Sequence, residues 1–240
     1  MALAAYKRVL LKVSGEALGG ESGMGFDFGV LSGLADIIKK CCESGVQLAI
    51  VVGAGNIWRG IKNGEGRIER TRADHMGMLG TVINALALSD VLEQKGVETA
   101  VMTALEMHAF AEPFSRTKAI AHLNRGRVVI FGCGTGNPLC STDTAAIMRA
   151  IEIDADIAML AKNIDGVYDR DPRKFPDAKK LDTITYQQII DQHLGVIDST
   201  AACMAHDVGM PALLFGAQDP ENIYRAILGE NIGSVVRNQI

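Results

Sequence analysis

The sequence contains few aromatic residues, few prolines and no large excess of one charge. Aromatic side chains make up 5% of the 240 residues, and the formal net charge is −4. Proteins that bind single-stranded nucleic acids combine aromatic stacking platforms with basic grooves, so this composition argues against a nucleic-acid partner. The length allows one large or two small domains. Because no proline-rich or serine-rich linker interrupts the chain, we expect a single domain over residues 1–240.

Cysteine is also scarce and carries no recognisable pattern. The five cysteines are an odd number, Cys41 and Cys42 are adjacent, and no Cys-x-x-Cys pair occurs. This is not the pattern of a secreted disulfide framework, and a reducing cytoplasm is favoured. No histidine stands at a metal-ligand spacing from Cys133 or Cys140, so we predict no protein metal ligand and expect both to be buried small hydrophobic residues.

Long hydrophobic runs are the third thing that the sequence lacks. The N-terminus shows no charged start followed by a long apolar segment, and no apolar run reaches the length of a membrane span. The sequence therefore predicts a soluble, cytoplasmic protein without a membrane partner.

A regular alternation of short apolar segments and helical patterns is present instead. Helices are predicted over residues 31–42, 75–94, 116–123 and 144–153. Each strand–helix–strand passage implies a right-handed crossover, so we predict an α/β fold, a three-layer α/β/α sandwich with a central, mostly parallel sheet. Residues 163–185, rich in Asp, Lys and Pro, break the pattern and predict an excursion from it. The predicted strands lie near Val9, Leu48, Ala100, Val129, Ile157 and Leu213.

Three of these strands are followed at once by glycine-rich loops. They precede residues 14–20, residues 53–56 and the run GCGTGNPLCSTD at 132–143. Glycine lets the backbone approach a ligand closely, and a helix start such as that near Asp143 attracts anions. Taken singly, each loop could be an ordinary surface turn. Because ligands collect outside the carboxyl ends of strands in open α/β sheets, three such loops together favour one shared phosphate site.

Lys12 ends the first predicted strand, just before the first glycine loop. A lysine there is costly to bury unless an anion such as phosphate meets it, although a solvated strand end is the alternative. The glycines match neither the Rossmann fingerprint nor a P-loop, and the protein-kinase motifs are missing. Any phosphate chemistry must therefore combine a lysine from one strand with glycine loops from others.

Four motifs together resemble the bacterial-type uridylate kinase family of the amino acid kinase superfamily. They are KVSGEAL at 12–18, GAGN at 53–56 with Arg59-Gly60, DHMGML at 74–79, and GTGNP at 134–138 followed by Thr142-Asp143. The resemblance runs from Lys7 to about Val235. It implies transfer of the γ-phosphoryl group of Mg-ATP to UMP, giving UDP and ADP in pyrimidine nucleotide biosynthesis, by one amino acid kinase-like domain.

The resemblance assigns the catalytic roles to Lys12 and Asp143. Phosphoryl transfer to a monophosphate brings two anions together, so catalysis rests on positioning and electrostatic stabilisation. Lys12 is expected to stabilise the transition state, Asp143 to orient Lys12, and the amides of Gly15, Gly53 and Gly55 to surround the phosphates. Mg²⁺ is expected to be held mainly by phosphate oxygens and water, so no protein ligand is named.

The resemblance also implies two sets of substrate contacts. Arg59 could bind a phosphate through its planar guanidinium group, and the loop from Thr135 to Thr142 is expected to recognise uracil. Lys162 stands where many relatives have threonine, and Asn163 where they have lysine. The implied ATP-binding residues are Lys12, Val13, Ser14, Gly15, Gly55, Arg59, Lys162, Asn163, Tyr168 and Asp171. The implied UMP-binding residues are Ala54, Asp74, Thr135, Gly136, Asn137, Pro138, Leu139, Cys140, Ser141 and Thr142.

Two aspartates precede predicted helices, where an N-cap is the simplest role. For Asp74 the resemblance adds contacts to the ribose hydroxyls of UMP. For Asp198 the N-cap and a catalytic role stay open. After Asp74, the apolar residues Met76, Met78, Leu79 and Val82 are expected to lie in the core.

Regulation and assembly rest on the resemblance alone. Family members are usually hexamers, and GTP activates some of them, so a homohexamer with GTP and UTP as effectors is expected. Two alternatives remain open, a kinase of carboxylates or carbamate and a UMP or UTP sensor without turnover. Arg59 and Asp74 argue against the first, and Lys12 with Asp143 against the second. The candidate GTP region consists of Gly20, Glu21, Ser22, Gly23, Met24 and Gly25.

Overall fold

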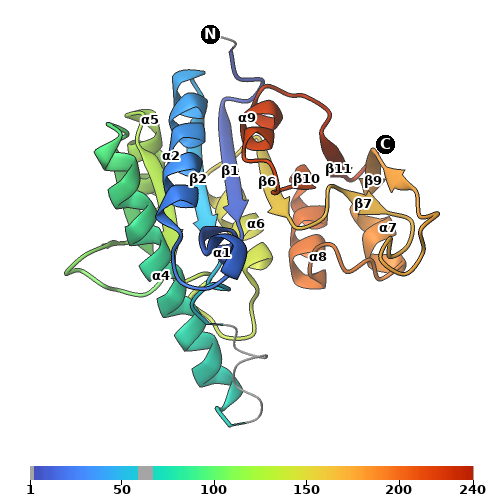
Figure 1. Cartoon of the computed structure of the whole chain (residues 1–240), viewed down its shortest axis with the longest axis horizontal. Coiled ribbons are helices and arrows are strands. Elements are labelled where there is room, and N and C mark those ends of the chain that lie inside the picture. Colours follow the sequence, from blue (N-terminus) through green and yellow to red (C-terminus); the bar gives the residue numbers. More distant parts are fainter. Residues whose placement is uncertain (1–2, 59–66, 240) are drawn as a thin grey trace.

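One mostly parallel sheet runs through the protein (Figure 1). The computed structural model describes residues 3–58 and 67–239. Within these residues nine strands pair in the order β4-β3-β5-β2-β1-β6-β10-β11-β9, and only β10 and β11 pair antiparallel. The strands are β1 (Arg8–Val13), β2 (Gln47–Val52), β3 (Thr99–Thr103), β4 (Glu112–Pro113), β5 (Val128–Gly132), β6 (Ile157–Lys162), β9 (Thr183–Thr185), β10 (Ala212–Gly216) and β11 (Gly233–Arg237).

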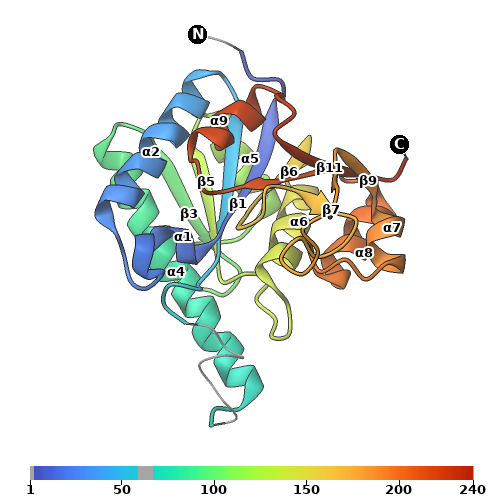
Figure 2. The same cartoon turned by 45° about the vertical axis from the view of Figure 1, so that its right-hand side comes forward.

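Helices cover both faces of this sheet (Figures 1 and 2). On one face α2 (Phe28–Glu43), α4 (Arg70–Gln94) and α9 (Glu221–Ile227) pack on the strands, and on the other α5 (Arg116–Asn124), α6 (Thr142–Glu152) and α8 (Ser199–Val208) do so. The predicted three-layer arrangement and its mostly parallel sheet are confirmed. The remaining helices are α1 (Gly15–Leu18), the short 3₁₀ helix η1 (Gly20–Ser22) and α7 (Tyr186–Asp191).

The central strands are apolar along their whole length because both of their faces are buried. In β1, Leu10 packs into the core beneath α6 and α8, whereas Val9 and Leu11 pack into the core beneath α2 and α4. Such continuous apolar runs are typical of strands covered on both sides. This is why the short apolar segments of the sequence predicted six of the nine strands.

The segment after β6 leaves the sheet, as predicted. Within residues 163–185 a two-stranded antiparallel ribbon forms from β7 (Val167–Tyr168) and β8 (Lys180–Leu181), and the chain then joins the sheet edge through β9. The excursion thus lies next to the carboxyl end of β6.

The start of α4 differs from the sequence prediction. The helix begins at Arg70, and Glu69 caps it by accepting hydrogen bonds from the amides of Thr71 and Arg72. Asp74 therefore lies inside the first turns of α4 and is not an N-cap. Its carboxylate is available for tertiary contacts instead.

The N-terminal half of α4 extends beyond the sheet, as Figure 1 shows. Met78 and Val82 are buried there as expected, but Met76 and Leu79 are 39% and 52% exposed. The prediction that these two residues lie in the core is wrong, because the apolar stripe continues past the strands that could cover it.

Helix α4 is also long and apolar enough to cross a membrane, contrary to the sequence prediction that no segment is. Its C-terminal half is a core helix, since Ala85, Leu88 and Leu92 are completely buried against α2 and the sheet. Packing within the protein therefore accounts for the apolar character of the C-terminal half of α4.

Candidate active site

Two lysines and one aspartate meet where β1, β6 and α6 converge. Lys12 lies near the end of β1, Lys162 ends the neighbouring strand β6, and Asp143 lies in the first turn of α6. The ammonium nitrogen of Lys12 is 3.3 Å from Asp143 Oδ1, and that of Lys162 donates to Asp143 Oδ2. The contact expected between Lys12 and Asp143 is present, whereas the part that Lys162 takes in it was not predicted.

Strand alternation explains why both lysines face the same helix. Residues two apart point to one face of a sheet. Leu10 and Leu160 pack beneath α6, so Lys12 and Lys162 follow them on that face. The Ser141 hydroxyl caps α6 by accepting hydrogen bonds from the amides of Asp143 and Thr144, which fixes the turn that carries the carboxylate.

All three side chains are largely buried, with 12% of Lys12, 12% of Asp143 and 16% of Lys162 exposed. Burial alone raises the pKa of Asp143, but the charges of Lys12 and Lys162 outweigh it and hold the pKa below its ordinary value of 3.8. Burial lowers the pKa of Lys162 from its ordinary value of 10.5, and Asp143 offsets this only in part. The aspartate is therefore ionised at neutral pH and binds two ammonium groups.

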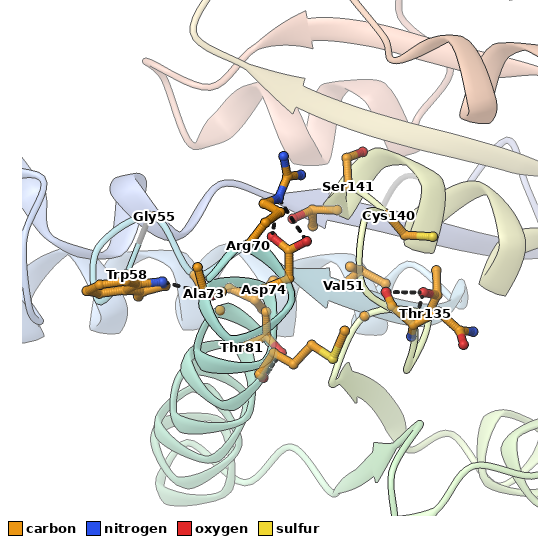
Figure 3. A pocket seen from close by; sticks show the side chains of 17 residues that line it. Val51, Gly55, Trp58, Arg70, Ala73, Asp74, Thr81, Thr135, Cys140 and Ser141 are labelled. Carbon is orange, nitrogen blue, oxygen red and sulfur yellow. Dashed lines mark hydrogen bonds and ion pairs between the residues drawn. The ribbon is translucent and has the colours of Figure 1, made fainter. Parts of the chain in front are cut away.

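A cavity of about 390 Å³ opens beside this cluster, between α4 and the loop that joins β5 to α6. Figure 3 shows Asp74 and Arg70 on α4 and Ser141 and Cys140 on the facing loop. The cavity is lined by apolar residues together with several polar side chains, as is usual for small-molecule sites. Of the predicted UMP-binding residues, the cavity is lined by Ala54, Asp74, Thr135, Asn137, Cys140, Ser141 and Thr142.

Asp74 joins the two walls of the cavity. Its carboxylate accepts a hydrogen bond from the amide of Leu139, 2.9 Å away in the β5–α6 loop. The single Nε–H of Arg70 is shared between both carboxylate oxygens, at 3.0 and 3.1 Å. Leu139 has a left-handed backbone, with φ of 66°, which is unusual for a leucine. The loop is thus held in a conformation that closes toward α4.

The first two glycine loops lie against each other. A Cβ on Gly15 would be 2.3 Å from the carbonyl oxygen of Gly53 and 2.7 Å from the amide nitrogen of Gly55, so only glycine fits there. The amide of Gly53 donates to the Val13 carbonyl at 3.0 Å. The prediction that this amide surrounds phosphate is therefore wrong, because it links β2 to β1 instead.

Asp198 is the N-cap of α8, accepting from the amide of Ala201 at 2.9 Å. It also accepts hydrogen bonds from the hydroxyls of Ser141 and Thr144. The Ser141 hydroxyl therefore ties the end of the β5–α6 loop to α8. The carboxylate of Asp198 is thus already engaged by the Ala201 amide and by two hydroxyl groups.

Several predicted site residues lie away from this cavity. Arg59 lies outside the described residues. Tyr168 donates to Asp165, and Asp171 accepts from Arg173 in the excursion after β6. Gly136 and Pro138 are in the β5–α6 loop but do not line the cavity. Val13 and Asn163 instead line another hollow, between α1, α2 and α9.

Other residues of the site were not predicted. Arg70, Trp58 and Thr81 line the cavity, and the Trp58 ring nitrogen donates to the Ala73 carbonyl at 2.9 Å. The four-residue spacing between Arg70 and Asp74 on a helix could have indicated their pair. Cys140 is exposed at the cavity, so its predicted burial is wrong.

The candidate GTP region contacts the second glycine loop. The amide of Gly25 donates to the Asn56 carbonyl at 2.8 Å, and the Asn56 side chain donates to the Gly25 carbonyl at 2.7 Å. Buried Asn84 on α4 pairs with the same Asn56 amide. The region is therefore fastened to a loop that borders the cavity.

Comparison with known proteins agrees with this geometry. Residues 7–216 match the amino acid kinase family. The crystal structure of UMP kinase from Bacillus anthracis is 39% identical, covers 98% of this chain and 97% of its own, and has a TM-score of 0.94. UMP kinase from Ureaplasma parvum is 33% identical, with 97% and 99% covered and a TM-score of 0.91. Uridylate kinase from Archaeoglobus fulgidus is 29% identical, with 95% and 99% covered and a TM-score of 0.73.

Proposed function

We propose that this chain, which belongs to the amino acid kinase family, transfers the γ-phosphoryl group of Mg-ATP to UMP in a single amino acid kinase-like domain, giving UDP and ADP. The UMP kinases of B. anthracis and U. parvum are similar to it over nearly the whole of both chains. This extent of similarity covers every element that builds the cavity and the lysine cluster.

One observation carries the proposal. The cavity with Asp74 at its rim and the cluster of Lys12, Asp143 and Lys162 adjoin at the start of α6, where Ser141 and Thr142 line the cavity and the next residue is Asp143. A nucleotide whose sugar lies near Asp74 would bring its phosphate toward the ammonium groups. This is the arrangement that an acceptor monophosphate requires.

The residues of the chain supply positioning and charge. A phosphate oxygen of UMP attacks the γ-phosphorus, and the bond from that phosphorus to the bridging oxygen of ADP breaks. The acceptor is already ionised, so no general base is needed. Lys12 stabilises the charge on the transferred group, and Asp143 holds the Lys12 ammonium in place.

Magnesium fits this site as an ion carried by the nucleotide. Within residues 3–58 and 67–239, no three His, Cys, Asp or Glu side chains cluster as a metal site, and the nearest carboxylate, Asp143, already binds two lysines. Mg²⁺ keeps water and phosphate ligands readily. When bound, it would neutralise phosphate charge, and we name no residue as its ligand.

The donor is proposed to lie on the β6 side of the cluster. Lys162 and Asn163 lead from β6 into the excursion that carries Tyr168 and Asp171. ATP held there would direct its γ-phosphate at the lysine cluster, opposite the cavity for UMP. The proposed ATP contacts of Lys12, Ser14 and Gly15 lie at the end of β1, beside β6.

Assembly as a homohexamer is proposed from the exposed stripe on α4. Met76, Leu79 and Ile83 recur at helical spacing and are 39%, 52% and 48% exposed. Such a stripe is typical of a helix that packs on a further surface. Light scattering tests this, and a monomer at micromolar concentration would contradict it.

Regulation and cellular role complete the proposal. The Gly25–Asn56 contacts would let GTP bound near residues 20–25 influence the glycine loop, and UTP is proposed as a second effector. The enzyme is proposed to be cytoplasmic and to serve pyrimidine nucleotide biosynthesis. Initial rates with and without each nucleotide test the regulation.

Acceptor identity is tested by ADP release from Mg-ATP. UMP, CMP, N-acetylglutamate, aspartate and carbamate are offered separately, with a control lacking acceptor. Turnover selective for UMP is expected. Turnover with an amino acid or carbamate would keep the fold but replace the acceptor, and tight UMP binding without turnover would favour a sensor.

A further inference from the structure

Lys162 is a charged residue in a largely buried place, at the end of a central strand. It ends β6 in the middle of the sheet, between β1 and β10. Its ammonium group reaches the carboxylate of Asp143, and only 16% of its side chain is exposed. A residue that contacted adenine would have to leave this ion pair.

The cluster contains two ammonium groups but only one carboxylate, so its positive charge is not fully balanced. Asp143 directs Oδ1 at Lys12 and Oδ2 at Lys162, so one buried carboxylate serves two buried ammonium groups. Burying an ammonium without a full counter-charge is unfavourable. Asp198 is the other carboxylate near Lys162, but it accepts from Ser141, Thr144 and the Ala201 amide.

A third hollow, of about 460 Å³, gives access to the Lys162 side of the cluster. It is lined by Lys162 and Asp143 together with Ser141, His193 and Asp198. Ser141 borders both this hollow and the cavity next to Asp74. An anion can therefore reach Lys162 from the side opposite the acceptor cavity.

We propose that Lys162 is a second catalytic cation, which contacts the transferred γ-phosphoryl group from the donor side while Lys12 contacts it from the β1 side. Asp143 positions both ammonium groups with its two oxygens. This inference rests on the proposed function, because it concerns the same phosphoryl transfer.

The chemistry needs both contacts at the same moment. As the bond between the γ-phosphorus and the ADP oxygen breaks and the bond to the UMP oxygen forms, negative charge is shared by the peripheral, attacking and leaving oxygens. Two fixed ammonium groups on different sides of the phosphorus stabilise that charge better than one. The leaving ADP oxygen keeps the electron pair of the broken bond, and no proton is transferred.

A purely structural role for Lys162 makes different predictions. If it only neutralised Asp143, its removal would lower stability and would weaken or disorder the site as a whole. If it contacts the transferred group, its removal would lower kcat and leave UMP affinity unchanged. The two roles are therefore separable by comparing kcat with UMP binding.

The test uses Lys162→Met and Lys162→Arg in the full-length protein, with Lys40→Met as the matched control. Lys40 pairs with Glu221 on the surface away from the cluster, so its replacement also removes one ammonium and one ion pair. For each protein, kcat with UMP, the Kd of UMP and thermal unfolding are measured. A fourth readout is the affinity of Mg-ADP with aluminium fluoride and UMP, which mimics the transferred group.

We expect Lys162→Met to lose about 10²–10³-fold in kcat and a similar factor in affinity for the aluminium fluoride complex, as for removal of one transition-state donor. UMP affinity and unfolding temperature stay near those of Lys40→Met, and Lys162→Arg recovers part of kcat. Full kcat in Lys162→Met, or a loss matched by lost UMP affinity or by unfolding, would overturn the proposal. An inactive wild-type protein would instead refute the proposed function.

Discussion

The carboxylate of Asp74 on α4 accepts a hydrogen bond from the backbone amide of Leu139, 2.9 Å away in the loop between β5 and α6. This contact connects the two walls of the proposed UMP cavity. It also fixes the side chain that the ribose hydroxyls would meet. The cavity is therefore pre-organised by a residue of the site itself.

Replacing Asp74 with alanine is expected to weaken UMP binding. Hydrogen bonds to a charged group contribute about 1.5–3 kcal/mol, which corresponds to a rise of roughly 10- to 150-fold in the KM for UMP. Steady-state kinetics at saturating ATP measure this change. Asp36→Ala, which removes an exposed carboxylate paired with Lys95, serves as the control. An unchanged KM in Asp74→Ala would remove Asp74 from the UMP site.

Lys12→Ala is expected to abolish nearly all turnover, with a loss of at least about 10²-fold in kcat, and to leave UMP binding largely intact. The reason is that Lys12 acts on charge that develops at the transferred group. Rapid-quench measurement of ADP formation and calorimetric titration of UMP test the two halves of this prediction. Normal turnover would exclude Lys12 from the mechanism.

Gly15→Ala is expected to destabilise the protein by about 1–3 kcal/mol, because the new Cβ would overlap the backbone of the second glycine loop. Gly33→Ala is the matched control, since it lies within α2 with no atom near its Cβ position and is expected to stabilise the protein by about 0.4–1 kcal/mol. Urea denaturation measures both. Equal stability of the two variants would contradict the close approach of the loops.

The pH dependence of kcat/KM for Mg-ATP is expected to depend on Lys162. Burial lowers the pKa of Lys162 below 10.5, so its charged form, and with it activity, is lost as pH rises through that lowered pKa. Lys12, Asp143, Asp198 and His193 are the ionisable groups around it.

An arginine at position 162 would stay protonated, because the pKa of a guanidinium lies well above that of an ammonium group. The alkaline limb of Lys162→Arg is therefore expected at higher pH than that of the wild-type protein. Coinciding alkaline limbs in the two proteins would show that Lys162 does not set the loss of activity.

Most of the fold could be predicted from the sequence, because the buried strands are continuous apolar runs and most of them are followed by a loop and a helix. The start of α4 could not, since aspartate is a preferred N-cap residue and glutamate is not, yet Glu69 caps the helix. Met76 and Leu79 repeat at core spacing, but α4 extends beyond the strands that would bury them.

The site was predictable where motif residues are close in sequence, and less so where contacts join distant elements. Lys12 and Asp143 were paired through the family resemblance, and the structure brings them together. Lys162 joins them because the side-chain alternation of β6 matches that of β1, a relation that needs the strand order. The Gly53 amide was expected at the phosphates. Its actual partner, the Val13 carbonyl, belongs to the neighbouring strand, and the sequence does not show that the two strands pair.

The central claim is that the cavity beside Asp74 holds UMP as the acceptor of a phosphoryl group from ATP. Phosphorus-31 NMR of the wild-type protein with Mg-ATP and UMP follows donor and acceptor in one measurement. The account predicts that the two phosphorus signals of UDP grow at the same rate as those of ADP. Release of inorganic phosphate with the UMP signal unchanged would contradict it.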